Sequence, residues 1–239
     1  MKIMVWVGIL TLLAGCSSTV VEDIGPTQAK QQGLEVATFA GGCFWCVEAG
    51  FEEIPGVKAA VSGYSGGRES NPSYRQVALG KTGHTESVQV YYDPEIISYS
   101  GLLQALWRIM DPTDAGGQFH DRGAQYRPAI FYHNEKQRRI AERAKTALAA
   151  SGRYDKPVTI ELVPFDKFYR AEAYHQDYYK KNPVRYQFYT FNSGRYQFVD
   201  EVWGEQRHVE FTQFRDDGIE DGTIRDRDMS HFEINPQVP

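Results

Sequence analysis

The chain is poor in cysteine, and its basic residues form no cluster. Three cysteines occur among its 239 residues, and 26 Lys and Arg are outnumbered by 31 Asp and Glu. Nucleic-acid binding depends on grouped Lys and Arg that neutralise phosphates, so nucleic acid is not an expected partner. His84, His120 and His175 show no short ligand repeat such as HxxxH, so we expect no bound metal. The remaining composition, 41% apolar and 24% charged, is typical of one main globular domain.

A hydrophobic run near the start is too short to span a bilayer. Residues 3–13 are almost entirely apolar, follow Lys2 and end in small residues before Cys16. This order is typical of a secretory signal peptide. Its ending resembles the lipobox of bacterial lipoproteins, in which the cysteine becomes the first mature residue and carries lipid. We expect residues 1–15 to be a lipoprotein signal peptide and Cys16 the lipidation site; a plain secretory signal with an incidental cysteine is the alternative.

The distribution of polar residues predicts how the chain is organised after the signal peptide. Residues 16–33 are mostly polar and lack periodic apolar positions, so we expect a flexible tether. Ser17 stands where inner-membrane retention usually has Asp, which favours the outer membrane, facing the periplasm of a bacterial cell. Residues 34–203 form the expected main domain, and residues 204–239 an acidic C-terminal extension.

Apolar periodicity predicts alternating strands and helices in the main domain. The predicted strands cover residues 34–40, 57–64, 85–92 and 128–132, and the predicted helices residues 44–54 and 99–107. The resulting order, β-α-β-β-α-β, is the ferredoxin-like arrangement. We therefore expect an α+β two-layer sandwich with helices on one face of the sheet, an extra C-terminal helix and irregular segments.

Weaker patterns follow this unit. Asn134 and Gln137 resemble a capping pair and predict a helix as far as Gly152. A further strand is predicted at residues 158–164 and a polar helix at 170–181. Residues 183–203 look irregular and aromatic, and a strand is expected at 209–214.

Two of the three cysteines lie three positions apart, in the sequence GGCFWC at residues 41–46. Cys43 follows a predicted strand and a Gly-Gly turn and begins a predicted helix, where backbone N–H groups favour negative charge. We therefore expect a lowered pKa for the Cys43 thiol and take it as the candidate nucleophile, with Cys46 one helical turn away. A disulfide between them would close a very short loop, so a purely structural role is poorly motivated.

This pair leaves two chemistries open: a thioredoxin-like disulfide exchanger, and a thiol that becomes a sulfenic acid resolved by its neighbour. Phe44 and Trp45 can form a small apolar pocket for a methyl-sized group beside the nucleophile, with core packing as the alternative. Glu86 begins a predicted strand. Burial near aromatic residues would raise its pKa and make it a neutral proton donor; a solvated glutamate is the alternative.

Several spaced motifs occur in an order that resembles the A-type peptide-methionine sulfoxide reductases. The resemblance covers residues 35 to about 200. The motifs are GCFWC at 42–46, NPSY at 71–74, TGHTE at 82–86, YDP at 92–94, DPT at 111–113, DRGAQYR at 121–127 and AEAYHQ at 171–176.

The resemblance implies reduction of methionine S-sulfoxide, free or in proteins, with no bound cofactor and with a thioredoxin-like protein or a dithiol as reductant. It implies that Cys43 attacks the sulfoxide sulfur and becomes a sulfenic acid, while protonated Glu86 gives a proton to the oxygen. Aromatic rings would hold the methyl group, and tyrosine hydroxyls would bond the oxygen. The implied substrate-binding residues are Phe44, Trp45, Tyr74, Asp121, Tyr126 and Tyr186.

Some members of the family have a recycling cysteine after a Lys-Asn-Pro segment and a tyrosine. Here KNP at 181–183 and Tyr186 match, but Gln187 stands in place of the cysteine. Cys46 is then the thiol left to resolve Cys43, as a Cys43–Cys46 disulfide that the reductant opens; direct resolution by an external thiol is the alternative. We expect a lipid-anchored reductase that repairs oxidised envelope proteins. A periplasmic disulfide exchanger and a lipoprotein that only binds partners are the competing hypotheses.

Overall fold

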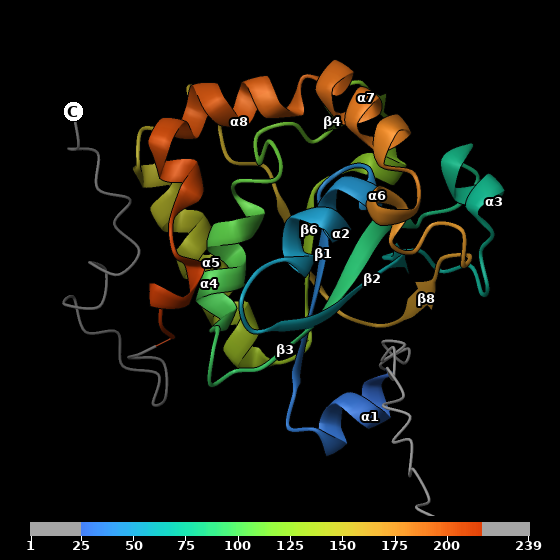
Figure 1. Ribbon diagram of the computed structural model, residues 1–239, viewed down its shortest axis with the longest axis horizontal. Helices are drawn as coiled ribbons and strands as arrows, with labels where there is room; N and C mark the ends of the chain where they lie inside the picture. Colours follow the sequence, from blue (N-terminus) through green and yellow to red (C-terminus); the bar gives the residue numbers. More distant parts are fainter. Residues whose placement is uncertain (1–24, 217–239) are drawn as a thin grey trace, which may run out of the picture.

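Six strands form one mixed sheet in the computed structural model, which describes residues 25–216 (Figure 1). The strands are β1 (Glu35–Ala40), β2 (Val57–Ser65), β3 (Thr85–Tyr92), β6 (Ala129–Tyr132), β7 (Glu161–Pro164) and β8 (Phe168–Arg170). Their order in the sheet is β7-β6-β1-β3-β2-β8. Neighbouring strands are antiparallel except β6 and β7, which run parallel.

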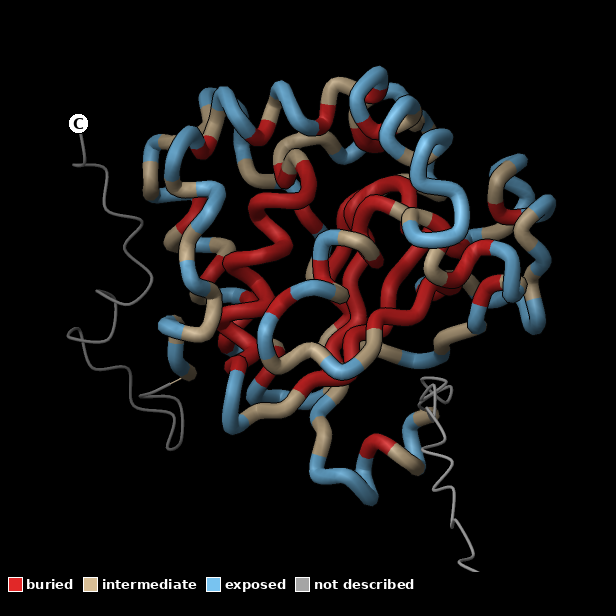
Figure 2. The backbone as a smooth tube through the Cα atoms, in the orientation of Figure 1, coloured by how far each residue is buried: buried red, intermediate tan, exposed pale blue. Residues whose placement is uncertain are grey.

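Three helices cover one face of this sheet: α2 (Phe44–Glu52), α4 (Tyr99–Leu106) and α5 (Glu135–Ala150). Phe39 of β1, Val88 of β3 and Leu102 of α4 are fully buried in the core between the two layers. Figure 2 shows that burial is greatest along the central strands and α4. The chain order β1-α2-β2-β3-α4-β6 and the sheet order β6-β1-β3-β2 confirm the expected ferredoxin-like α+β sandwich.

The opposite face of the sheet is covered in part by the short helix α1 (Pro26–Gln31). Its Ala29 packs with Val61 of β2 and Tyr91 of β3 in a separate apolar cluster. Since β3 is an inner strand of the sheet and is covered on both faces, all eight of its residues are buried. Glu86, near the start of β3, is therefore carried into the interior by its strand.

The helix after the fourth predicted strand begins at its capping pair. Asn134 Oδ1 accepts a hydrogen bond from the Gln137 N–H at 2.9 Å, and the Gln137 side chain accepts one from the His133 N–H. These bonds satisfy N–H groups that have no partner within the first helical turn. The prediction from Asn134 and Gln137 is confirmed, and α5 begins at Glu135.

The polar helix predicted for residues 170–181 is wrong. The segment starts in β8, which pairs with β2, continues as turns, and is helical only in α6 (Tyr178–Lys181). The Gln176 side chain bonds both the N–H and the carbonyl of Ser62, at 3.0 and 2.9 Å. These bonds tie the turn segment to β2, so tertiary contacts override the local helical preference.

Residues 183–203, predicted to be irregular, form two consecutive helices, α7 (Pro183–Ser193) and α8 (Arg195–Trp203). Pro183 occupies the first turn of α7, and Gly194, with φ of +85°, separates the helices. Pro at a helix start and Gly just past a helix end are standard boundary signals. Figure 1 shows both helices lying across the end of the sandwich at which α2 begins.

The strand predicted at 209–214 is also wrong, because this segment contains only the 3-10 helix η3 (Phe211–Gln213). It packs on the start of α4, where Ser98 Oγ donates to the Phe214 carbonyl at 2.8 Å and the Ser100 N–H donates to Asp216 at 2.9 Å. These bonds satisfy groups at the start of α4.

Cys16 and the predicted signal peptide lie outside the described residues, as do residues 217–239 of the acidic extension. Between residues 25 and 216 we find no helix long and apolar enough to cross a membrane. That part of the chain also has no group of three or more His, Cys, Asp or Glu placed to hold a metal ion.

Candidate active site

Cys43 lies at the start of α2, after a turn that requires glycine. Gly42 has φ of +86°, and a Cβ there would lie 2.5 Å from the Cβ of Gln118. Gln118 is held in place, since its side chain bonds the N–H and the carbonyl of Asp111, both at 2.7 Å. A side chain at position 42 would therefore push the start of α2, and Cys43 with it, out of place.

Gly42→Ala is expected to destabilise the fold more than Gly152→Ala. Both glycines have positive φ, so both substitutions incur the cost of about 1–2 kcal/mol that an L residue meets there. A Cβ at Gly152 meets nothing within 4 Å, whereas one at Gly42 overlaps Gln118 and adds a further ~1–3 kcal/mol. Urea unfolding of both variants measures the difference, and equal losses would contradict the packing argument.

The structure gathers seven of the predicted site residues around one small cavity. Its volume is about 80 Å³. A water molecule takes about 30 Å³ in the liquid, so this cavity has room for about three groups of that size. The lining residues are Cys43, Phe44 and Trp45 of α2, Glu86 of β3, Tyr74 of α3 (Tyr74–Ala78), Asp121 of β5 (Asp121–Arg122), Tyr126 of the 3-10 helix η1 (Ala124–Tyr126), and Tyr189 of α7.

Glu86 is buried beside the nucleophile, with 2% of its surface exposed. Its pKa is raised to about 8: burial and the Asp121 charge raise it, and a hydrogen bond from the Phe44 N–H, 3.0 Å from Oε2, partly offsets them. The raised pKa predicted for Glu86 is confirmed, and the solvated alternative is excluded. Below pH 8 the carboxyl is mostly protonated and has a proton to donate.

The thiols of Cys43 and Cys46 are buried and hydrogen-bonded to each other. Burial and the bond to Cys46 raise the pKa of Cys43 well above its usual value. The pKa of Cys46 falls to about 6, because it accepts that bond and lies near the charge of Arg195. The lowered pKa predicted for Cys43 is wrong, because burial of the thiol outweighs the effect of the helix start. Near neutral pH the pair thus carries one negative charge, which the two sulfurs share.

Trp45 is held by contacts on its face and its edge. Its ring stacks on Tyr178 with centroids 3.7 Å apart, and its Nε1–H donates to His175 Nδ1 at 3.0 Å. Burial lowers the pKa of His175 to about 4, so the imidazole is neutral at pH 7 and Nδ1 accepts this bond. The indole therefore forms a rigid wall of the cavity, and Phe44, 1% exposed, belongs both to this wall and to the core.

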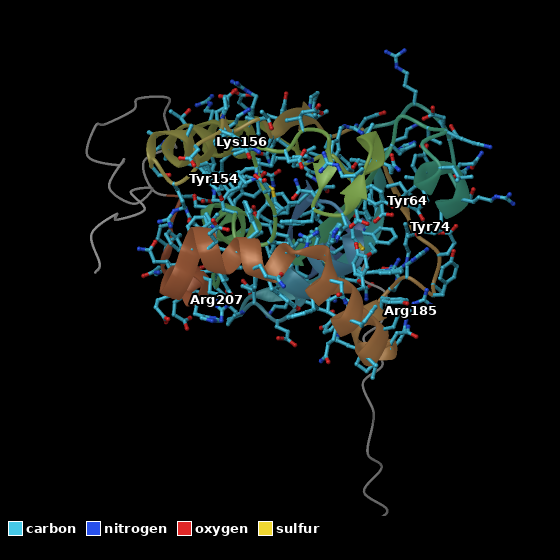
Figure 3. The ribbon with its side chains drawn as sticks, turned by 90° about the horizontal axis from the view of Figure 1, so that it is seen from above. Tyr64, Tyr74, Tyr154, Lys156, Arg185 and Arg207 are labelled. Atoms are coloured by element: carbon cyan, nitrogen blue, oxygen red, sulfur yellow. The ribbon has the colours of Figure 1, made fainter. Side chains whose placement is uncertain are left out.

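The tyrosines of the cavity remain protonated donors. Burial raises the pKa of Tyr74 to about 12 and that of Tyr126 further. Glu172, within the AEAYHQ motif, positions Tyr74 by accepting its N–H at 2.9 Å, and accepts the Tyr64 hydroxyl at 2.8 Å. Figure 3 shows Tyr64 and Tyr74 on the same side of the molecule. Hydroxyls of this kind can bond an oxygen atom held in the cavity.

The structure places Tyr189, not Tyr186, in the cavity with Cys43. The Tyr189 hydroxyl donates to the Asp121 carboxylate, which orients both groups. Tyr186, one helical turn earlier on α7, lines a neighbouring cavity with Cys46. Sequence reasoning missed Tyr189 because the segment was not predicted to be helical, so the three-residue spacing of the two tyrosines had no structural meaning.

Arg195 and Thr190 were also missed. The Arg195 guanidinium is buried, donates to the carbonyls of Gly41 and Ile109, and lies over the Phe119 ring at 4.7 Å. Thr190 Oγ1 lies 3.6 Å from Cys46 Sγ. Because neither residue belongs to a recognised motif, no sequence signal connected them with the cysteines, although both favour negative charge on Cys46.

Arg195→Met is expected to raise the first pKa of the thiol pair by roughly 1–3 pH units, since a charge that stabilises the thiolate is lost. Arg195→Lys should restore part of the difference. Thiolate absorbance measured against pH reports this pKa. Arg185→Met, which removes an exposed arginine of α7 (Figure 3), is the control and should leave it unchanged. An unaltered pKa in Arg195→Met would show that the Arg195 charge does not act on the thiols.

Neutral Glu86 beside Cys43 can give a proton to an oxygen atom in the cavity while the sulfur forms a bond to the atom next to it. A disulfide exchanger needs no such donor, because its leaving group is a stable thiolate. The fold and the site therefore define a thiol-dependent oxidoreductase with a small aromatic pocket for an uncharged group.

Comparison with known proteins identifies the family. The sequence model described as peptide methionine sulfoxide reductase matches residues 35–207. The peptide methionine sulfoxide reductase MsrA of Listeria innocua is 53% identical over 173 residues, covering 72% of this chain and 98% of that protein. The corresponding Bacillus subtilis protein is 52% identical over 170 residues, covering 71% and 96%. The chain belongs to the peptide methionine sulfoxide reductase family, and it is a peptide methionine sulfoxide reductase of the MsrA type.

Comparison with solved structures supports the same family. Methionine sulfoxide reductase A of Corynebacterium diphtheriae superposes with a TM-score of 0.59 at 34% identity, over 70% of this chain and 81% of that one. Reduced Mxr1 from Saccharomyces cerevisiae gives a TM-score of 0.57 at 31% identity, over 64% and 87%. The resemblance seen in the sequence motifs is confirmed, and the disulfide exchanger is not favoured.

Proposed function

We propose that this enzyme reduces the S epimer of methionine sulfoxide, free or in proteins, through a sulfenic acid on Cys43. One observation carries the proposal: Cys43 and a protonated Glu86 face the same cavity, which is of methyl sulfoxide size and walled by Phe44 and Trp45. The aromatic walls suit the methyl group, and the hydroxyl of Tyr126 suits the oxygen.

In the first step the charge moves from sulfur to the carboxyl group. The proton shared by the two thiols shifts to Cys46, which leaves Cys43 as the thiolate nucleophile. The Cys43 sulfur attacks the sulfoxide sulfur, and Glu86 protonates the oxygen. The protonated oxygen then passes to Cys43 as both the sulfur–oxygen bond of the substrate and the new sulfur–sulfur bond break. The products are methionine, a Cys43 sulfenic acid and an ionised Glu86.

In the second step Cys46 resolves the sulfenic acid. Its thiol attacks the Cys43 sulfur, the hydroxyl leaves as water, and a Cys43–Cys46 disulfide remains. The interaction between the two thiols in the reduced enzyme supports a direct attack of Cys46 on the Cys43 sulfur. A thioredoxin-like protein or a dithiol then reduces the disulfide, and no bound cofactor takes part.

The location of this activity is proposed from residues 1–33 of the sequence. A lipid on Cys16 would anchor the enzyme in the bacterial envelope, at the outer membrane and facing the periplasm, where it repairs oxidised proteins. Residues 17–25 would act as the tether between lipid and domain. The tether predicted for residues 16–33 is wrong in its second half, because residues 26–31 form α1 and pack on the sheet through buried Ala29. Incorporation of labelled palmitate into the wild-type protein, and its loss in Cys16→Ser, tests the anchor.

Thiol counting tests the chemistry. Reduced protein freed of residues 1–16, so that Cys43 and Cys46 are its remaining cysteines, receives methionine S-sulfoxide without reductant. Release of one methionine per molecule, with loss of both thiols and two hydrogens of mass, is the expected result. Methionine release with one added oxygen on the protein would show that Cys46 does not resolve the sulfenic acid. Absence of methionine would refute the mechanism at Cys43.

A further inference from the structure

Cys46 lines a second cavity, which is separate from the one at Cys43. Its volume is about 710 Å³, and it shares no lining residue with the smaller cavity. Two consecutive residues of α7 divide the spaces: Tyr189 lines the Cys43 cavity and Thr190 lines the second cavity. The Cys-x-x-Cys pair therefore lies between two cavities: Cys43 lines the smaller one and Cys46 lines the larger one.

The wall of the second cavity holds a buried cation that lacks a carboxylate partner. Arg195 is 4% exposed and lines this cavity, and its Nε makes no hydrogen bond. No Asp or Glu among residues 25–216 lies within ion-pair distance of its guanidinium. In the reduced enzyme the negative charge on the thiol pair balances Arg195, and the disulfide removes that charge. A buried charge without a counter-charge is costly, so the oxidised enzyme favours an anion beside Arg195.

The charged residues around this cavity also favour the binding of an anionic ligand. The lining has three arginines, Arg108, Arg195 and Arg207, against the two acids Glu53 and Asp200. Arg207 lies beyond the end of α8 and is labelled in Figure 3. Arg207 pairs with Asp200, so the positive charge of Arg108 and Arg195 exceeds that of the remaining acid. An incoming thiolate meets a favourable potential along this wall.

We propose that the second cavity is the entry site for the external dithiol reductant, whose thiolate attacks Cys46 of the Cys43–Cys46 disulfide. This inference rests on the disulfide proposed above. Attack needs open space at the sulfur, and for Cys46 the second cavity supplies it. The Cys43 cavity, at about 80 Å³, is much smaller than the second cavity, at about 710 Å³, so sulfoxide and reductant use separate entrances.

The reaction balances as two thiol–disulfide exchanges. The reductant thiolate bonds to the Cys46 sulfur, the Cys43–Cys46 bond breaks, and the electron pair leaves on Cys43. Cys43 is the leaving thiol of higher pKa, so access to Cys46 and not leaving-group pKa determines the point of attack. The second thiol of the reductant then attacks the reductant's own sulfur in the mixed disulfide. This forms the reductant's disulfide and releases Cys46 as a thiolate beside Arg195. The dithiol is oxidised by two electrons, and the enzyme disulfide is reduced by two.

The position of the mixed disulfide tests this assignment. Enzyme oxidised by one equivalent of methionine sulfoxide is first checked for loss of two hydrogens. It is then mixed with glutathione, quenched in acid within the first turnover and alkylated. Fragment masses should place glutathione on Cys46 and the alkyl group on Cys43. Glutathione on Cys43 would overturn the inference and leave the proposed function intact, whereas absence of the initial disulfide would overturn both.

A blocking variant tests the entrance. Ala49, one turn after Cys46 on α2, lines the second cavity and not the first. In Ala49→Trp, reduction of the disulfide by dithiothreitol should slow about tenfold or more, while single-turnover methionine release keeps its rate. Ala149→Trp, at an exposed position of α5, is the control and should change neither rate. Disulfide reduction at the wild-type rate in Ala49→Trp would refute the entrance.

Discussion

Replacing Cys43 by serine is expected to lower methionine sulfoxide reduction at least about 10⁴-fold, as for other enzymes that lose their nucleophile. The serine hydroxyl is not ionised in this site and cannot accept the sulfoxide oxygen as a sulfenic acid does. The substitution changes one atom, so the cavity and the stability of the fold should be little altered. Methionine release with excess dithiothreitol measures the loss.

Cys46→Ser is the matched variant for this experiment. It retains Cys43 and Glu86, so it should release one methionine per molecule in a single turnover and then stop unless an external thiol intervenes. If Cys43→Ser also released one equivalent, the nucleophile would have to lie elsewhere. If Cys46→Ser released none, the resolving role given to Cys46 would be incomplete.

Glu86→Gln is expected to lower the single-turnover rate by about 10²–10⁴, the usual contribution of a general acid. The amide oxygen can still accept the Phe44 N–H, so the start of α2 keeps its support. It cannot give a proton to the sulfoxide oxygen. Glu48→Gln is the control, because Glu48 is also a buried carboxyl of α2, with a pKa raised by burial to about 7, yet it lines neither cavity.

The pH dependence gives a second reading of Glu86. The wild-type rate should rise as the thiol pair loses its first proton near pH 6. It should fall above pH 8, because Glu86 acts in its protonated form and its pKa is about 8. In Glu86→Gln the fall above pH 8 should disappear while the rise near pH 6 remains. A fall that persists in Glu86→Gln would assign the upper limb to another group.

The βαββαβ unit was predictable because its signals are local. Strand alternation, helical spacing and the Gly and Pro residues at element ends all lie within short windows of sequence. The errors fall in segments whose conformation depends on distant partners. Residues 171–177 are turns because Gln176 bonds Ser62, more than a hundred positions earlier in the chain. In α7, exposed Val184, Phe188 and Phe191 obscured the boundary between apolar and polar faces.

Seven cavity residues could be chosen from the sequence because they stand within motifs of recognisable spacing and chemistry. Tyr189, Thr190 and Arg195 could not, because α7 and α8 bring them to the cysteines from about 150 residues away and no motif contains them. The same separation in sequence explains why Tyr186 was predicted at the cavity where the structure places Tyr189. Which of two tyrosines on a helix faces a cavity depends on how that helix is rotated against its neighbours.

The amino-acid order was sufficient to establish the strand and helix succession of the βαββαβ unit, the thiol pair at the start of a helix, and the kind of chemistry that such a pair performs. The ionisation of that thiol pair could not be predicted from the sequence. The pKa of each thiol depends on burial and on charges within a few ångströms, and those are supplied by Glu86, Asp121 and Arg195 from three other parts of the chain. Folding alone brings those charges to the sulfurs, and so it sets the ionisation of the pair and opens the two sulfurs to different cavities.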